Sequence, residues 1–261
     1  MPELPDLCVF SQNLKKRILN IDIGSVTVGN PNKVSNPGLF CEKVTGTSIK
    51  DIVREGKELH FMLANNNCFG VHLMLNGKFH ICPREEAEKI NYRIISLFLE
   101  DGQAFVTADF QGLCRVTLNP KPAKAPDALS DAFTLEYFLG MVKKNSHKNV
   151  KAVLIDQNAV RGIGNAYVDE ILWKAGISPG STIGRIPADK QQDLFNAIPS
   201  VLTAAIQSIL EISPEIINGE ERSFLGVHNP RKKFTDEGDA IIRKTVAGKT
   251  TYYTDKQKIY L

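Results

Sequence analysis

Asn158-Ala159-Val160-Arg161-Gly162-Ile163-Gly164-Asn165 is the stretch on which the fold of the second half of the chain depends. Apolar residues at helical spacing predict a helix on each side of it, over residues 149–157 and 166–175. The glycines allow a tight turn between the two helices. Backbone N–H groups at such a turn, and at the start of the next helix, can hold a phosphate without reading bases. A plain packing corner between two helices explains the local pattern equally well.

Further helices and strands are predicted on either side of this turn. Apolar spacing favours helices over residues 131–143 and 189–211, and a segment rich in proline and alanine over 121–130 reads as a linker. Near the C-terminus the sequence predicts strands over residues 232–235, 239–246 and 251–257. A turn at Ala247-Gly248-Lys249-Thr250 joins the last two of them.

The first 120 residues carry a different pattern. Apolar residues first recur at helical spacing, which predicts a helix that buries one face: Leu7, Phe10, Leu14 and Ile18. Short alternating runs follow, and Asp101-Gly102 between two of them is a strong hairpin signal. The predicted strands cover residues 25–28, 59–63, 68–75, 79–82, 92–99, 104–108 and 115–118. We therefore expect a helix that leads into a β-sandwich or flattened barrel.

Together these patterns predict an α+β fold with several domains. The expected order is an N-terminal helix and β-sandwich over residues 1–120, a linker over 121–130, a helical domain over 131–220 and a β-hairpin over 221–261. A chain of 261 residues is long enough to bury two cores.

Composition and charge narrow the class of protein. Hydrophobic residues make up 43% and charged residues 23%, and no apolar run approaches about 20 residues, so we expect a cytoplasmic protein without a membrane partner. The five cysteines form no CxxC pair, which argues against a disulfide framework or a zinc site. Residues 221–261 hold nine Lys and Arg against five Asp and Glu, whereas the first 220 residues balance to −1. This concentration of positive charge suggests a polyanion contact in the tail, although a solvated charged hairpin would look similar.

The first six residues, Met1-Pro2-Glu3-Leu4-Pro5-Asp6, suggest covalent chemistry. Removal of Met1 would leave Pro2 as a free secondary amine beside the carboxylate of Glu3. An α-amino group has a pKa of roughly 8, so much more of it is the neutral nucleophile at physiological pH than of a lysine side chain. Its attack on a sugar C1′ gives an iminium that is cationic without a proton, and Glu3 could protonate the opening ring. The alternative is that Pro2 only favours removal of Met1 and Pro5 only starts a helix.

Several motifs occur in the same order and spacing as in one known family. They are Met1-Pro2-Glu3-Leu4-Pro5, Arg54-Glu55-Gly56-Lys57, His72-Leu73 with Gly77, Leu154-Ile155-Asp156-Gln157, Gly162-Ile163-Gly164-Asn165 with Tyr167, Asp169-Glu170-Ile171-Leu172, and Gly248-Lys249-Thr250-Thr251-Tyr252-Tyr253. The chain thereby resembles the formamidopyrimidine-DNA glycosylase/endonuclease VIII family of base-excision repair enzymes. The resemblance implies an N-terminal catalytic domain, a helix-two-turns-helix DNA-binding domain and a C-terminal finger.

The resemblance also implies an activity and a set of site residues. It implies a bifunctional DNA glycosylase that removes oxidised bases and, as a lyase at apurinic or apyrimidinic sites, cleaves the strand by β- or δ-elimination through a Schiff base. The implied residues are the nucleophile Pro2, the general acid Glu3, Asp6 in support of ring opening, Lys57, and the phosphate-binding His72, Asn165 and Lys249. The expected partner is damaged DNA, duplex or single-stranded, bound by a monomer. The alternative is a non-catalytic binder of damaged or structured nucleic acid on the same scaffold.

The sequence departs from the family pattern in its finger. The positions that hold four zinc-binding cysteines in bacterial members correspond here to Phe234, Glu237, Thr254 and Gln257, none of them a soft ligand. We therefore expect no zinc and no other cofactor, as in the zincless finger of some members. The finger turn carries Lys249 where the family usually has arginine, so the charge is kept but the bidentate contact with phosphate is lost.

A second departure concerns the side chains that fill the gap left by an everted nucleotide. Family members use Met, Arg and Phe. Here the corresponding residues are Leu75 and a loop, Asp109 to Cys114, in which Gly112 cannot pair with an orphaned base and Leu113 could act as a wedge. The sequence therefore predicts weak selectivity for the opposite base. Asp6 is a third departure, because the family usually has glutamate there.

Overall fold

The chain begins with helix α1 (Leu4–Ile18) in the computed structural model, which describes residues 1–261. Pro5 lies in the first turn, where a missing N–H costs no hydrogen bond. Asp6 closes a capping box, because its Oδ2 accepts a hydrogen bond of 2.8 Å from the Glu3 N–H. The predicted apolar face is confirmed, since Leu7, Phe10, Leu14 and Ile18 are all buried.

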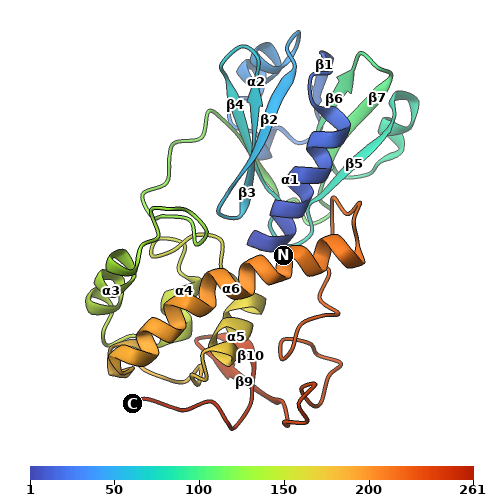
Figure 1. Ribbon diagram of the computed structural model, residues 1–261. Coiled ribbons are helices and arrows are strands. Elements are labelled where there is room, and N and C mark those ends of the chain that lie inside the picture. The colour runs from blue at the N-terminus through green and yellow to red at the C-terminus, as the bar shows by residue number, and fades with distance from the viewer. The chain divides into compact units, whose positions relative to one another are not determined.

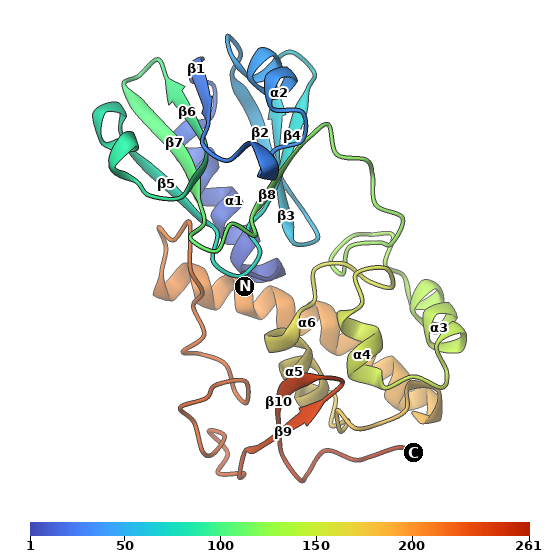
Figure 2. The same cartoon turned by 180° about the vertical axis from the view of Figure 1, so that it is seen from behind.

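Two four-stranded antiparallel sheets form the predicted sandwich, and α1 runs along them in Figure 1. One sheet has the order β1-β6-β7-β5, with β1 Ile23–Val28, β6 Arg93–Leu99, β7 Gln103–Ala108 and β5 Lys78–Pro83. The other has the order β2-β3-β4-β8, with β2 Ile49–Glu55, β3 Glu58–Leu63, β4 Cys68–His72 and β8 Arg115–Leu118, and the view from behind in Figure 2 shows β8 clearly. Phenylalanines from both sheets meet in one core, where the rings of Phe61 on β3 and Phe105 on β7 have centroids 5.4 Å apart. The hairpin predicted at Asp101-Gly102 joins β6 and β7.

Three local predictions for this region were incomplete or wrong. Strand β2 and helix α2 (Pro37–Val44) were not predicted, because the charged residues along β2 mask its alternation and α2 is only eight residues long. The strand predicted over residues 68–75 ends at His72. Met74 has a φ of 55°, in the left-handed region, so the chain turns before Leu75. Short 3-10 helices cover Pro31–Lys33, Arg84–Lys89 and Ile183–Arg185.

The predicted helices of the second half are present as α3 (Leu135–Lys144), α4 (Val150–Ile155), α5 (Asn165–Lys174) and α6 (Ala188–Ile212). Gln157 holds the predicted turn between α4 and α5 from inside. Its Nε2 donates to the Ile163 carbonyl at 2.9 Å, and its Oε1 accepts from the Gly162 N–H at 3.0 Å. The turn therefore has a fixed shape, set by one amide side chain.

Helix α6 is long and apolar enough, by length and composition alone, to cross a membrane. Its buried residues nevertheless recur on one face, at Leu194, Ile198, Leu202 and Ile209. Asp189, Lys190 and Asp193 lie in its first two turns, and Pro199 lies inside it. This is the pattern of an amphipathic core helix.

The C-terminal hairpin consists of β9 (Ile242–Val246) and β10 (Lys249–Tyr253). The strand predicted over residues 232–235 is wrong, because that segment forms only an isolated bridge between Phe234 and Ala240. The predicted linker over residues 121–130 is also more than a linker. Ala125 and Asp127 are buried, and the Arg161 Nε donates to the Ala125 carbonyl at 2.7 Å. The segment is therefore tied to the turn between α4 and α5.

The chain divides into two compact units, and the division differs from the predicted ranges. Unit 1 comprises residues 1–122 and 209–220, and unit 2 comprises residues 123–208 and 221–261. Residues 209–220 fall in unit 1 because they bond to α1 and to the sandwich. The Asn13 Nδ2 donates to the Ile216 carbonyl at 2.9 Å, and the Asn218 Nδ2 donates to the Phe79 carbonyl at 3.2 Å.

Candidate functional site

Pro2 lines a small pocket of unit 1, with a volume of about 240 Å³. The other lining residues are Leu75, Asn76, Gly77, Lys78, Gly219 and Glu220. The ammonium group of Met1 pairs with the Glu220 carboxylate in the same place. The structure therefore brings together the predicted nucleophile Pro2 and the predicted gap-filling residue Leu75, which lie far apart in the sequence.

Glu3 and Asp6 are two buried carboxylate residues at the start of α1. Glu3 is 4% exposed and Asp6 is fully buried. The N-cap position of Glu3 fixes its backbone beside Pro2, and the hydrogen bond from the Glu3 N–H to Asp6 holds that geometry. This contact gives Asp6 a structural function, because its shorter side chain already closes the cap. Its part in ring opening stays a prediction.

Lys57 and His72 lie at neighbouring positions in the β2-β3-β4-β8 sheet. Lys57 follows Gly56 in the hairpin between β2 and β3. On the neighbouring strand β4, Val71 pairs with Leu59 of β3, and His72 is the next residue toward the hairpin. Burial lowers the pKa of His72, and the nearby positive charge of Lys57 acts in the same direction. The His72 Nδ1 accepts a hydrogen bond of 3.0 Å from the Met74 N–H. The ring is therefore neutral near pH 7 and carries its proton on Nε2, where it can donate to a phosphate oxygen.

Leu75 projects from a tight turn, and its side chain is 55% exposed. The Gly77 N–H donates to the Leu73 carbonyl at 2.9 Å. A Cβ on Gly77 would lie only 2.4 Å from that carbonyl oxygen, so the turn requires glycine. The turn thus presents an apolar side chain to solvent beside the pocket that Pro2 lines.

The loop from Asp109 to Cys114 is built around the buried carboxylate of Asp109. Its Oδ2 accepts from the Leu113 N–H at 2.6 Å and from the Cys114 N–H at 2.7 Å. With the backbone held in this way, Phe110 is 63% exposed and Leu113 is 36% exposed. Sequence reasoning singled out Leu113 but missed Phe110, whose only signal was an aromatic residue among polar loop residues.

The phosphate-binding candidates of unit 2 lie at the turn that precedes α5 and at the C-terminal hairpin. The Asn165 Nδ2 donates to the Thr250 carbonyl at 2.9 Å, and Thr250 follows Lys249 at the start of β10. Lys249 is exposed. The structure therefore brings Asn165 close to the hairpin turn, and phosphate binding by Asn165 and Lys249 stays a prediction.

A buried ion pair that the sequence did not predict connects α4, α5 and β10. The Lys151 Nζ lies 2.7 Å from the Asp169 Oδ1 and donates to the Thr251 Oγ1 at 2.7 Å. The Asp169 Oδ2 accepts from the Tyr252 N–H at 3.0 Å. Both charged side chains are fully buried. The turn and the hairpin that carry the phosphate-binding candidates are thus fixed to one another through Asp169.

The four finger positions do not fit a tetrahedral zinc site. The Gln257 Oε1 accepts from the Thr254 N–H at 2.8 Å, and its Nε2 donates to the Ile177 carbonyl at 2.8 Å. Phe234 is 59% exposed and has no ligand atom. No group of three or more His, Cys, Asp or Glu side chains that could hold a metal ion occurs in residues 1–261. Gln257, which the resemblance aligns with a zinc-ligand position, makes two hydrogen bonds within the protein.

We expect the hairpin to fold, and DNA binding to survive, after treatment with EDTA, because hydrogen bonds and burial hold it in place of a metal. Elemental analysis of the purified protein and DNA-binding titrations before and after chelation measure this. Stoichiometric zinc, or loss of binding in EDTA that added zinc restores, would contradict the expectation.

Comparisons with known proteins find relatives along nearly the whole chain. Residues 1–116 match the family model described as the formamidopyrimidine-DNA glycosylase N-terminal domain, and residues 124–213 match the one described as the formamidopyrimidine-DNA glycosylase H2TH domain. The formamidopyrimidine-DNA glycosylase of Carboxydothermus hydrogenoformans is 32% identical over 267 residues, which cover 97% of this chain and 98% of that protein. The enzyme of the same name from Shouchella clausii is 29% identical, with 97% of each chain covered.

Solved structures show the same likeness. A structure of MutM in complex with carbocyclic 8-oxo-G containing DNA superposes with a TM-score of 0.87 and 26% identity, over 98% of this chain and all of the other. Lactococcus lactis Fpg in complex with FAPY-dG containing DNA gives a TM-score of 0.85 and 25% identity, over 97% and 98% of the two chains. The fold and the matches along the chain define a DNA glycosylase of base-excision repair. The chain belongs to the formamidopyrimidine-DNA glycosylase family.

Proposed function

We propose that this protein removes oxidised bases from DNA and then cleaves the strand, with Pro2 as the nucleophile of both steps. One observation carries the proposal: Pro2 lies at the buried start of α1, in a pocket beside Leu75, with Glu3 next to it. Relatives along nearly the whole chain are glycosylases, and two similar structures are complexes with DNA that contains carbocyclic 8-oxo-G or FAPY-dG. This favours the enzyme over a non-catalytic binder on the same scaffold.

The chemistry requires Pro2 as a free amine. Once Met1 is removed, the Pro2 nitrogen attacks C1′ of the damaged nucleotide, and the base leaves with the glycosidic electron pair and takes up the proton that the amine loses. Glu3 then protonates the ring oxygen, the C1′–O4′ bond breaks, and the nitrogen lone pair forms the iminium with C1′. The resulting iminium makes the C2′ proton acidic. Its loss expels the 3′ phosphate and breaks the strand, and water then releases the amine. None of these steps needs a base-specific contact, so the lyase half extends to any abasic site.

Two assays test the proposal. Release of free base and strand cleavage are measured on oligonucleotides that carry 8-oxoguanine, a formamidopyrimidine, or an abasic site. We expect base release and cleavage from the oxidised substrates, and cleavage of abasic DNA by the same protein. Binding of all three without any product would leave only the non-catalytic alternative.

The proposed phosphate contacts divide into cationic and neutral ones. Lys249 should release about one counterion on binding, so Lys249→Ala should lower the slope of log affinity against log salt by about one for all sequences alike. His72 is neutral because burial lowers its pKa, so His72→Ala should weaken binding and leave the slope unchanged. Titrations of abasic DNA at several salt concentrations measure both slopes. A Lys249→Ala variant that altered only base preference, with its slope intact, would show that Lys249 does not contact phosphate.

The exposed Leu75 is proposed to fill the gap in the stack after base eversion. Leu75→Ala should therefore reduce cleavage of duplex DNA about ten-fold or more, since emptying the stack costs roughly a few kcal/mol. Cleavage of single strands should change much less, because they have no partnered stack to support. Parallel rate measurements on the two substrates give the ratio. Since Gly112 offers no hydrogen bond to the opposite base, a sharp preference for one opposite base in duplex DNA would contradict the assignment.

A further inference from the structure

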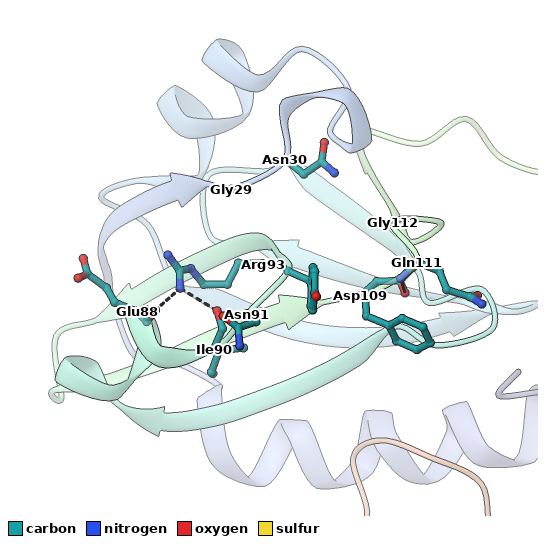
Figure 3. Close-up of a pocket in the computed structure, with 11 residues that line it drawn as sticks. Gly29, Asn30, Glu88, Ile90, Asn91, Arg93, Asp109, Gln111 and Gly112 are labelled. Atoms are coloured by element: carbon teal, nitrogen blue, oxygen red, sulfur yellow. Dashed lines mark hydrogen bonds between the residues drawn. The ribbon is translucent and has the colours of Figure 1, made fainter.

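Unit 1 contains a second pocket, separate from the one that Pro2 lines, with a volume of about 530 Å³ (Figure 3). Three segments form it: residues 29–30 after β1, residues 88–93 at the start of β6, and residues 109–112 after β7. Figure 3 shows Asn30 across the pocket from Asn91. The segments are held together by backbone bonds, such as that from the Asp109 N–H to the Tyr92 carbonyl at 3.0 Å. The pocket is therefore a fixed feature of the sandwich.

Two of the three charged residues of the pocket wall make hydrogen bonds within the protein. The Asp109 carboxylate accepts backbone hydrogen bonds from the loop that follows it. The Arg93 guanidinium donates to the Ala87 carbonyl at 3.2 Å and to the Ile90 carbonyl at 2.8 Å. Neither side chain is therefore the main recognition group of this pocket.

The groups left to meet a ligand are aromatic rings and amides, together with the exposed carboxylate of Glu88. Tyr92 is 67% exposed and Phe110 is 63% exposed, and neither ring contacts another ring in the protein. Tyr92 also has a φ of 58°, which is strained for a bulky residue and typical of functional positions. The side-chain amides of Asn30 and Asn91 make no hydrogen bond within the protein.

This combination fits one ligand chemistry. A nucleobase is flat and aromatic, so it stacks on exposed rings. Its edge carries hydrogen-bond donors and acceptors, and a side-chain amide can pair with both because it has an N–H donor and a carbonyl acceptor. A cation for the phosphate group attached to that nucleotide lies close to the pocket. The Lys33 Cε is 4.0 Å from the position that a Cβ atom on the lining residue Gly112 would occupy. We propose that the pocket of Tyr92 and Phe110 binds an unpaired nucleobase of the DNA near the lesion.

The position of the pocket connects it with the proposed activity, on which this inference rests. The Asn76 Nδ2 donates to the Gln111 Oε1 at 2.6 Å, and Asn76 lines the pocket of Pro2 while Gln111 lines the aromatic one. Occupation of the aromatic pocket requires a base that has left its partner. The enzyme therefore favours single-stranded or locally open DNA around the damaged nucleotide.

The inference is tested by a double-mutant cycle, in which the aromatic side chains and the flanking bases are removed separately and together. Binding of the full chain is measured by fluorescence anisotropy with two single strands that both hold an uncleavable tetrahydrofuran abasic analogue. In one strand the flanking nucleotides carry bases, and in the other they are baseless. We expect the Tyr92→Ala/Phe110→Ala double variant to bind the first strand about ten-fold more weakly than the unaltered protein. It should bind the baseless strand equally well, because stacking needs a base.

Two further variants make the result specific. Phe110→Trp keeps a stacking surface and should retain the preference for bases, whereas Met62→Ala, which removes an apolar side chain of 40% exposure on β3, should have no effect. Thermal melting checks that each variant is folded. If the double variant bound both strands equally more weakly, or bound neither more weakly, the inference would be overturned. The two exposed rings would then be assigned to contact with a protein partner. Failure of the proposed function would be distinct, since the unaltered protein would then show the base preference but cleave no abasic DNA.

Discussion

Pro2→Gly is expected to lower lyase turnover on abasic DNA at least about 100-fold, which corresponds to about 2.7 kcal/mol of activation free energy. The secondary amine of proline gives an iminium that is cationic without a proton, whereas the primary amine of glycine gives an imine that must be protonated before elimination. Glycine also relaxes the backbone that holds the amine at the start of α1. Turnover is measured under single-turnover conditions with protein whose Met1 removal has been verified by mass spectrometry.

Two comparisons control this experiment. Pro5→Ala changes the other proline of the segment without touching the amine, and it should retain most of the activity because Pro5 only lies in the first turn of α1. Protein that retains Met1 should be almost inactive, since its Pro2 nitrogen is an amide. Substantial turnover by the Met1-bearing protein would place the nucleophile elsewhere.

Lys151→Met is expected to destabilise unit 2 by about 3–5 kcal/mol, because it removes the lysine cation from the buried Asp169 carboxylate and leaves that carboxylate only its contacts with the His228 ring and the Tyr252 N–H. At roughly 2–4 °C per kcal/mol for a domain of this size, the unfolding midpoint should fall by about 10 °C. Tyr252 donates its backbone N–H to the same carboxylate, so hydrogen exchange should also accelerate in β10. Calorimetry and exchange mass spectrometry measure the two effects.

The matched control for this substitution is an exposed ion pair. The Lys190 Nζ lies 2.6 Å from the Asp193 Oδ2 at the surface of α6, and exposed pairs contribute little. Lys190→Ala should leave the unfolding midpoint unchanged. A Lys151→Met variant that melts with the unaltered protein would show that the buried pair does not hold the hairpin in place.

The sequence predicted the order of elements wherever one signal was strong. The periodic apolar face of α1, the hairpin at Asp101-Gly102 and the glycine turn before Asn165 are all present, because local spacing and backbone freedom decide them. Strand β2 was missed because charged residues mask its alternation, and its conformation is set by its pairing with β3. The false strand at residues 232–235 has the opposite cause, since its residues find only an isolated bridge.

The candidate site could be predicted only where the reacting groups belong to residues that are adjacent in the sequence. Pro2 and Glu3 are adjacent in the sequence, so their combination was visible. The burial of Lys151 was not, because a lysine in a helix is normally exposed, and only the folded chain places Asp169 and Thr251 around it. The pair of Tyr92 and Phe110 was hidden for a similar reason, since two turns far apart in the sequence form one pocket.

Borohydride trapping on abasic DNA, followed by mass spectrometry of the cross-linked peptide, tests the central claim most directly. Reduction of the Schiff base joins the reacting nitrogen permanently to C1′ of the opened sugar. We expect a single cross-linked peptide that begins at Pro2 and carries the sugar on its N-terminal nitrogen, from protein that has lost Met1. Efficient trapping by protein that retains Met1, or a cross-link on a side chain such as Lys57, would contradict the account.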